Sequence, residues 1–125
     1  MLPGVLIALQ EKYKLSDEDI IPYLFTAGAV GYVIANNACI AGATGGCQAE
    51  VGSASAMSAA AAVEMSGGTP GQAADAMAIA LTNMLGLSCD PVAGLVEVPC
   101  IMRNAAGASN ALTAAWMAMA GVKSR

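Results

Sequence analysis

The sequence predicts an all-α fold, a compact bundle of about five to six Ala- and Met-rich helices whose Gly- and Pro-rich loops carry cysteines. Of the 125 residues, 57% are hydrophobic but only 4% are aromatic. Alanine and methionine favour helices, whereas the β-branched and aromatic residues that favour strands are few. No repeat or low-complexity linker divides the chain, so we expect a single helical domain over residues 1–125.

The first two helices follow from spacing and capping signals. Apolar residues fall in helical spacing directly from the start of the chain. Ser16 followed by Asp19 has the pattern of a capping box, and the acidic residues there favour a helix N-terminus. We expect this second helix to run towards Cys39, with a short break allowed at Pro22.

Three further helices are expected after a glycine-rich interruption at residues 42–46. Thr69 and Gln72 have capping-box spacing, and Pro70 suits the first helical position. The expected ranges are about Gln48–Met65, from Pro70 to near Leu85–Leu87, and about Asn104–Ala120. The segment between the last two is rich in turn-forming residues, including Asp90-Pro91 and Gly94.

The charged residues exclude some classes of function. The net charge is −4 and the chain has only five Lys and Arg, so it lacks the basic patch that a nucleic-acid partner requires. It has no His, the most frequent general base and a frequent metal ligand. Acid–base chemistry must therefore come from Glu, Asp, Lys, Tyr or Cys, or from residues outside this chain.

The segment Ile20–Ala49 has no charged residue, which raises the question of a membrane span. A spanning helix needs roughly 20 apolar residues. This segment contains Pro22, Asn36, Gln48 and several glycines, and no Lys or Arg brackets it. We expect a buried helix and a loop rather than a membrane segment. No basic region of a signal peptide is visible either, and we expect a cytoplasmic protein.

The four cysteines have different local contexts. Cys39 lies within an apolar run and is expected to be an ordinary core residue. Cys47 follows two glycines at an expected helix start, where the helix dipole favours the thiolate that binds metals. Cys89 and Cys100 flank the Pro- and Gly-rich segment, which can bring two sulfur atoms to one site.

This pattern of cysteines favours an iron–sulfur cluster over zinc, while leaving unliganded buried thiols as the alternative. A zinc ribbon needs closely paired cysteines, which are absent here. Three soft ligands on separate loops without His suit a cluster. A [4Fe–4S] cubane held by three cysteines leaves one iron open. Such an iron can act as a Lewis acid for a substrate hydroxyl, which suits dehydration rather than electron transfer.

Several motifs resemble one enzyme family. Residues 43–54, around Cys47, resemble the α region of iron–sulfur-dependent L-serine dehydratases, and the similarity continues through Glu64–Pro70. It is closest over Leu85–Cys100 and Arg103–Ala105. The resemblance covers essentially the whole chain.

The resemblance implies a pyridoxal-phosphate-independent deamination of L-serine to pyruvate and ammonia. It also implies that Cys47, Cys89 and Cys100 hold the [4Fe–4S] cluster, which air can remove, and it gives Cys39 no role. Members of this family have a Thr-Asn-Gly segment ahead of these motifs, a β chain or domain, and further residues after them. We therefore expect a core fragment of the α domain that is inactive alone.

Acid–base candidates follow from charged residues in apolar sequence surroundings. Glu50, Glu64 and Glu97 are the candidates, because burial would raise a carboxyl pKa into a useful range. Each is also compatible with a purely structural role.

Substrate-binding candidates lie beside Cys47 and after Cys100. The amides of Thr44, Gly45 and Gly46 precede a helix and are candidates for binding the substrate carboxylate. The alternative is a glycine loop needed only for close approach to the cluster. Arg103 is a candidate for pairing with the same carboxylate, or a structural cation.

Two rival classes of function remain open. One is a non-catalytic apolar helical module with unliganded cysteines, and the other is an iron–sulfur electron carrier with a fourth protein ligand. The surplus of apolar residues also predicts exposed interaction surfaces, most simply in a two-fold homodimer.

Overall fold

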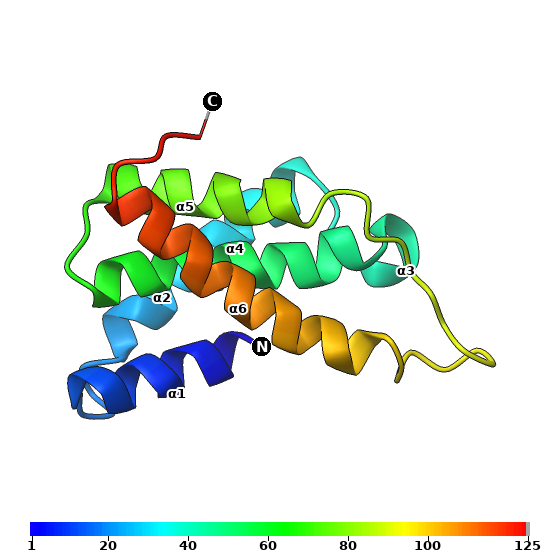
Figure 1. The fold of residues 1–125 in the computed structure, drawn as a ribbon, viewed down its shortest axis with the longest axis horizontal. Coiled ribbons are helices and arrows are strands. Elements are labelled where there is room, and N and C mark those ends of the chain that lie inside the picture. Colours follow the sequence, from blue (N-terminus) through cyan, green and yellow to red (C-terminus); the bar gives the residue numbers. More distant parts are fainter. Residues whose placement is uncertain (125) are drawn as a thin grey trace.

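The computed structural model describes residues 1–124 and confirms the all-α prediction. Its six helices are α1 Leu2–Tyr13, α2 Ile21–Asn37, α3 Gly42–Gly45, α4 Cys47–Met65, α5 Pro70–Asn83 and α6 Cys100–Met119. Across these residues the β-structure amounts to one isolated bridge between Val92 and Leu95. Figure 1 shows the helices gathered into one bundle, from which the connection between α5 and α6 extends at one end.

Helix α4 is the centre of the bundle. Each of the other five helices packs against it, and most of its side chains are buried. These side chains are mainly Ala and Ser, which leave room for neighbouring helices to approach closely. Helix α6 is one example, because a Cβ on its Gly107 would lie only 2.9 Å from the Val51 side chain. The predicted Ala-rich helix is therefore the core itself rather than a layer around it.

A polar connection ties α4, α5 and α6 together inside this core. The hydroxyl of Ser55 donates to the carbonyl of Gly107 at 2.9 Å. The amide of Asn110 donates to the Ser55 hydroxyl at 2.9 Å and to the Ala80 carbonyl at 3.0 Å. Buried polar groups need such partners, so this network fixes how the three helices are rotated relative to one another.

The capping box predicted for α5 is confirmed. Thr69 N donates to the Gln72 side chain at 2.8 Å, and Gln72 N donates to the Thr69 hydroxyl at 3.3 Å. Pro70 is the first residue of the helix, as expected. The helix ends at Asn83, slightly before the expected end near Leu85–Leu87, and turns follow it.

The start of α2 differs from the prediction. The reciprocal hydrogen bonds of Ser16 and Asp19 form, with Ser16 N donating to the Asp19 carboxylate at 2.8 Å. They close a turn over residues 17–20, and the helix begins only at Ile21. Pro22 lies in its first turn, where its missing N–H costs nothing. The proline therefore starts this helix rather than breaking it.

The start of α6 also differs. It begins at Cys100 instead of about Asn104, and Ile101 N donates to the Glu97 carbonyl at 2.8 Å. The Asn104 side chain donates back to the Cys100 carbonyl at 3.0 Å. Cys100 thus belongs to a helical first turn and has a defined direction relative to the rest of α6.

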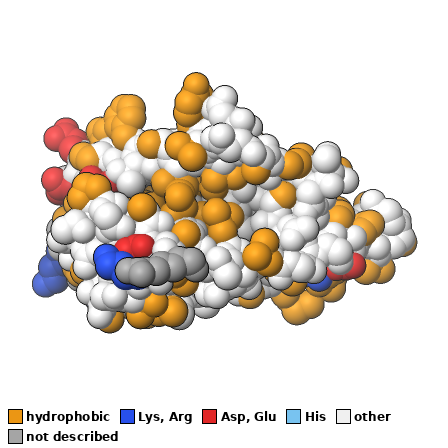
Figure 2. All heavy atoms as spheres, turned by 90° about the horizontal axis from the view of Figure 1, so that it is seen from above, with side chains coloured by type: hydrophobic (Ala, Val, Ile, Leu, Met, Phe, Trp, Pro, Cys, Tyr) orange, Lys and Arg blue, Asp and Glu red, His pale blue; other side chains and the backbone are white. Residues whose placement is uncertain are grey.

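Helix α2 was expected to be buried, and this is wrong for one of its faces. Only Ala27 and Ile34 are buried, while Phe25 and Tyr32 are 76% and 72% exposed. No helix of the described chain is long and apolar enough to cross a bilayer. Figure 2 shows a face of the molecule where apolar side chains are spread between a few charged groups, as the low content of charged residues leads one to expect.

Protonation of Asp75 should release the end of the described chain from α5. The Asp75 carboxylate pairs with Lys123 at 3.0 Å and accepts hydrogen bonds from the amide and hydroxyl of Ser124, both at 3.1 Å. The Ser124 amide, followed by Lys123, lowers the pKa of Asp75 below its ordinary value. Because the folded-state pKa is the lower one, this stabilisation is present above the unfolded value of about 3.9 and is lost as pH falls through the folded value.

Amide exchange of Ser124, followed across this acidic range by NMR, measures the release. Asp75→Asn should show fast exchange already at neutral pH. Protection that persists unchanged in Asp75→Asn would contradict this account of the docking.

Candidate functional site

Three cysteines from separate segments line one cavity of about 360 Å³. Cys47 is the first residue of α4, Cys89 lies in the connection between α5 and α6, and Cys100 is the first residue of α6. These segments meet at the end of the bundle that also carries α3 (Figure 1). The cavity is completed by Gly42, Ala43, Glu50, Val51, Val96, Ile101 and Asn104.

The three thiols influence one another electrostatically. Cys47 is buried, with 4% of its surface exposed, and Cys89 and Cys100 are half-buried. Loss of solvent raises the pKa of the Cys100 thiol, and the nearby Cys47 and Cys89 thiols raise it further. The Arg103 guanidinium opposes this increase. Arg103 therefore acts on two of the three thiols, those of Cys47 and Cys100.

The spacing of the thiols bears on what the cavity can hold. Within residues 1–124, no three His, Cys, Asp or Glu side chains are close enough to bind a single metal ion. A cubane is larger than one ion, so its thiolate ligands stand further apart. The cavity is lined by three thiols and the carboxylate of Glu50, and thiolates are the ligands that iron–sulfur clusters take.

The segment that carries Cys89 docks on the N-terminus of α4. The amides of Cys47 and Gln48 donate to the carbonyls of Ser88 and Leu87, at 3.3 and 2.9 Å. Gly46 has φ +78°, and a Cβ there would lie 2.7 Å from the Leu87 carbonyl oxygen. A glycine is thus required at this position for the segment to approach.

The amides of Thr44, Gly45 and Gly46 do not lie free for a substrate carboxylate. Thr44 N and Gly45 N donate to the Ala41 carbonyl, at 3.2 and 2.8 Å, and Gly46 N donates to the Gly42 carbonyl at 2.8 Å. These hydrogen bonds form the short helix α3. The expectation of available amides is therefore wrong, and what Thr44 offers is its exposed side chain.

Arg103 contacts protein groups on two other segments. Its Nη1 donates to Cys47 Sγ at 3.3 Å and to the Ser88 carbonyl at 2.9 Å. Its Nη2 pairs with the Asp90 carboxylate at 2.6 Å. This pairing, together with the Ser88 hydroxyl, lowers the pKa of Asp90. The contacts with Cys47 and Asp90 raise the pKa of Arg103 itself.

The three candidate glutamates occupy different places. Glu50 lines the cysteine cavity, and its carboxylate lies against Gly42. Glu97 is exposed on the α5–α6 connection and does not line the cavity. Burial in apolar surroundings was expected for all three, but Glu50 and Glu97 are exposed and only Glu64 is half-buried.

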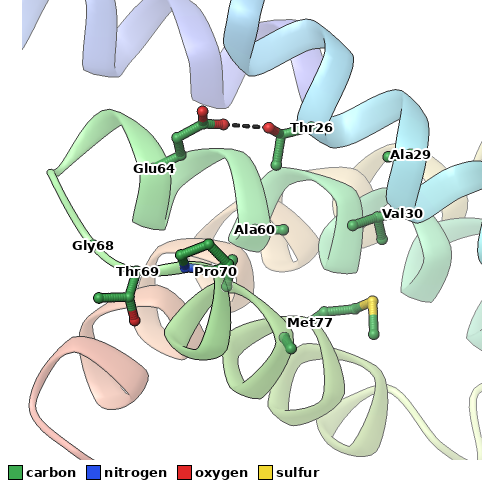
Figure 3. Close-up of a pocket in the computed structure, with 11 residues that line it drawn as sticks. Thr26, Ala29, Val30, Ala60, Glu64, Gly68, Thr69, Pro70 and Met77 are labelled. Carbon is green, nitrogen blue, oxygen red and sulfur yellow. Dashed lines mark hydrogen bonds between the residues drawn. The ribbon is translucent and has the colours of Figure 1, made fainter.

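Glu64 lies far from the cysteines. It is near the opposite end of α4, about 25 Å from Cys47 at 1.5 Å per residue. There its carboxylate accepts a hydrogen bond from the Thr26 hydroxyl across a separate cavity between α2, α4 and α5 (Figure 3). The structure therefore brings only Glu50 together with all three cysteines.

Cys39 is not the core residue that its sequence context predicts. It follows the end of α2, is half-buried, and its thiol contacts the Ala41 backbone and Gly45. It does not line the cavity of the other three cysteines. Its apolar neighbours in sequence lie partly on an exposed helix face, so an apolar sequence context does not predict burial here.

Two polar residues of this site carried no recognisable signal in the sequence. Asp90 was interpreted only as a turn former before Pro91, but it is the ion-pair partner of Arg103. Asn104 lines the cavity from the first turn of α6. Neither the Asp90–Arg103 ion pair nor the place of Asn104 in the cavity follows from local spacing, because each depends on how separate segments pack.

Fold and site together define an α-helical domain that gathers three cysteine side chains at one end of a bundle. A family model described as the serine dehydratase alpha chain matches residues 1–125, and the chain belongs to this family. The resemblance inferred from the motifs is thereby confirmed.

Relatives of this chain carry the same name. It is 68% identical over 125 residues to the probable L-serine dehydratase alpha chain of Bacillus subtilis (strain 168), covering 100% of this chain and 42% of that protein. It is 60% identical over 124 residues to the probable alpha chain of Latilactobacillus sakei, covering 99% and 59%. The L-serine dehydratase alpha chain of Peptoniphilus asaccharolyticus is 52% identical over 124 residues, with 99% and 42% covered. The chain thus spans about half the length of these relatives.

Proposed function

We propose that this chain is the cluster-binding part of an L-serine dehydratase that converts L-serine to pyruvate and ammonia without pyridoxal phosphate. The observation that carries the proposal is the meeting of Cys47, Cys89 and Cys100 at one cavity. The family membership and the names of the relatives support the substrate.

In this proposal the three cysteines hold a [4Fe–4S] cluster. The donor set fits, because three soft sulfur ligands from separate segments line one cavity. When bound, the cluster supplies an open iron that acts as a Lewis acid on the β-hydroxyl of serine. Three protein ligands rather than four distinguish this role from that of an electron carrier.

The residues of this chain contribute a base and the walls of the cavity. Glu50 is proposed as the group that removes the α proton of serine, because it is the carboxylate that shares the cavity with the cysteines. Loss of this proton and of the β-hydroxyl gives aminoacrylate, which takes up water and yields pyruvate and ammonia. Val51, Val96 and Ile101 supply the apolar part of the cavity wall.

This chain supplies only some of the contacts that orient the substrate. The side chain of Thr44 and the amide of Asn104, which lines the cavity, are proposed to contact the serine carboxylate. Further contacts come from a β chain or domain, which the name "alpha chain" of the relatives suggests. We also propose a cytoplasmic protein that pairs with a second copy, partly through the exposed face of α2.

Anaerobic reconstitution of the complete enzyme with iron and sulfide tests this function. The expected product is brown, contains four iron atoms per chain, and shows an electron paramagnetic resonance spectrum that changes when L-serine is added. A colourless protein under these conditions would favour the non-catalytic helical module. A cluster that is reduced reversibly and does not respond to L-serine would favour the electron carrier.

A further inference from the structure

Arg103 is the one side chain of the described residues that links all three cysteine-bearing segments by hydrogen bonds. It belongs to α6, one turn after Cys100. It reaches α4 through the thiol of Cys47 and the α5–α6 connection through Ser88 and Asp90. We propose that Arg103, held in place by Asp90, is a positioning residue that sets the cysteine segments in register before any cluster binds.

The segment around Cys89 has few other attachments. On its N-terminal side, Gly86 N donates to the Gln48 side chain at 3.0 Å, and the Leu87 and Ser88 carbonyls accept from the amides of α4. On its C-terminal side, residues 91–98 are all exposed, and the described hydrogen bonds of Val92 and Leu95 join these two to each other. The next described attachment is at Glu97, whose carbonyl accepts from Ile101 N of α6 at 2.8 Å. The position of Cys89 therefore depends mainly on the contacts of residues 86–90.

The Ser88 carbonyl is the junction of this docking. It accepts from Cys47 N at 3.3 Å and from Arg103 Nη1 at 2.9 Å, so one oxygen is held by both α4 and α6. The Asp90 carboxylate pairs with the guanidinium from the other side and also accepts from the Ser88 hydroxyl at 2.9 Å. Cys89 lies between these two anchored residues.

The guanidinium suits this role in shape as well as in charge. Its planar fork presents several N–H donors in fixed directions, so it can serve a sulfur, a carbonyl and a carboxylate at once. A lysine carries the same charge on a single flexible ammonium and cannot reproduce this geometry. The positive charge next to Cys47 also offsets the repulsion that three thiolates around one cavity would experience.

Asp90 restricts Arg103 to this role. It occupies Nη2 of the guanidinium at 2.6 Å, and with only 20% of the Arg103 side chain exposed the group is held against the protein. A substrate carboxylate would need the paired donors that Asp90 and Ser88 already use. The contacts of Arg103 therefore favour a structural cation over a residue that binds the substrate carboxylate. Its structural role is to position the cysteine segments.

The test compares the metal-free full-length protein with its Arg103→Lys and Asp90→Asn variants. The amides of Cys47 and Gln48 report directly on docking, because they donate to the carbonyls of the Cys89 segment. We expect hydrogen exchange at these amides to become at least about tenfold faster in both variants, with alkylation of Cys89, resolved by peptide, accelerating similarly. Lys123→Gln removes a charge from the other ion pair and is the matched control that should change neither quantity.

The proposal fails if both variants, folded by circular dichroism, keep wild-type exchange at these amides and wild-type alkylation of Cys89. If Arg103→Lys does not fold, Asp90→Asn decides alone, because it leaves the guanidinium in place. The inference rests on the proposed cluster site, yet its readout needs no cluster. Loosening of the segment in a protein that never takes up iron would sustain the positioning role and reject the proposed function.

Discussion

Replacing Cys89 by alanine should remove stable cluster binding from the complete enzyme and with it the dehydration of L-serine. The cavity offers three thiols, and a cubane held at only two corners would be exposed to solvent and lost. Removing a residue that merely supports a metal ligand costs about 10–100-fold. Loss of a ligand should exceed this range, so activity should fall to background. Iron and sulfide content after anaerobic reconstitution, together with pyruvate formation, measure the effect.

Cys39→Ala is the matched control for this experiment. It removes the same atom from a cysteine that lies outside the cavity, and it should leave iron content and activity at wild-type levels. Equivalent losses are expected for Cys47→Ala and Cys100→Ala. A Cys89→Ala enzyme that keeps four iron atoms and its activity would remove Cys89 from the ligand set.

Replacing Glu50 by glutamine should lower kcat by about 10²–10⁴-fold, the usual contribution of a general base. The glutamine keeps the size and most of the contacts of Glu50 against Gly42 but cannot accept the α proton. The cluster should remain, since no cysteine is disturbed. Steady-state kinetics with L-serine measure the loss, and iron content shows that it does not arise from cluster damage.

Two other carboxylates make this experiment selective. Glu64→Gln should change kcat little, because Glu64 lies about 25 Å along α4 from Cys47. Glu11→Gln, an exposed carboxylate of α1, controls for loss of charge alone. Unchanged kcat in Glu50→Gln, or an equal fall in Glu64→Gln, would require a base from elsewhere in the enzyme.

Much of the fold was predictable because it depends on local chemistry. The capping box of Thr69 and Gln72 and the proline at the first position of α5 involve only four consecutive residues. The small side chains of α4 are read directly from residue type. Helix boundaries were less predictable. Pro22 and Cys100 both lie in a first helical turn, where sequence spacing cannot distinguish a helix start from an irregular segment.

The meeting of the cysteines was predictable only through resemblance. Their spacing suggested soft ligands on separate loops, but spacing could not place Cys47, 42 residues before Cys89, at the same cavity. Cys39 shows the limit of local context, because its apolar neighbours indicated burial, whereas most residues of α2 proved exposed.

By itself, the amino-acid sequence determined the helical class, the Ala-rich helix after the glycine-rich segment and the thiols available for chemistry, since these depend on residue type and periodicity. Tertiary structure alone decided that Glu50 rather than Glu64 faces the cysteines, that the glycine amides are occupied, and that Arg103 pairs with Asp90. The physical reason is distance along the chain. Helical periodicity relates residues within a turn or two, whereas these contacts join separate segments and exist only once α4 and α6 have packed.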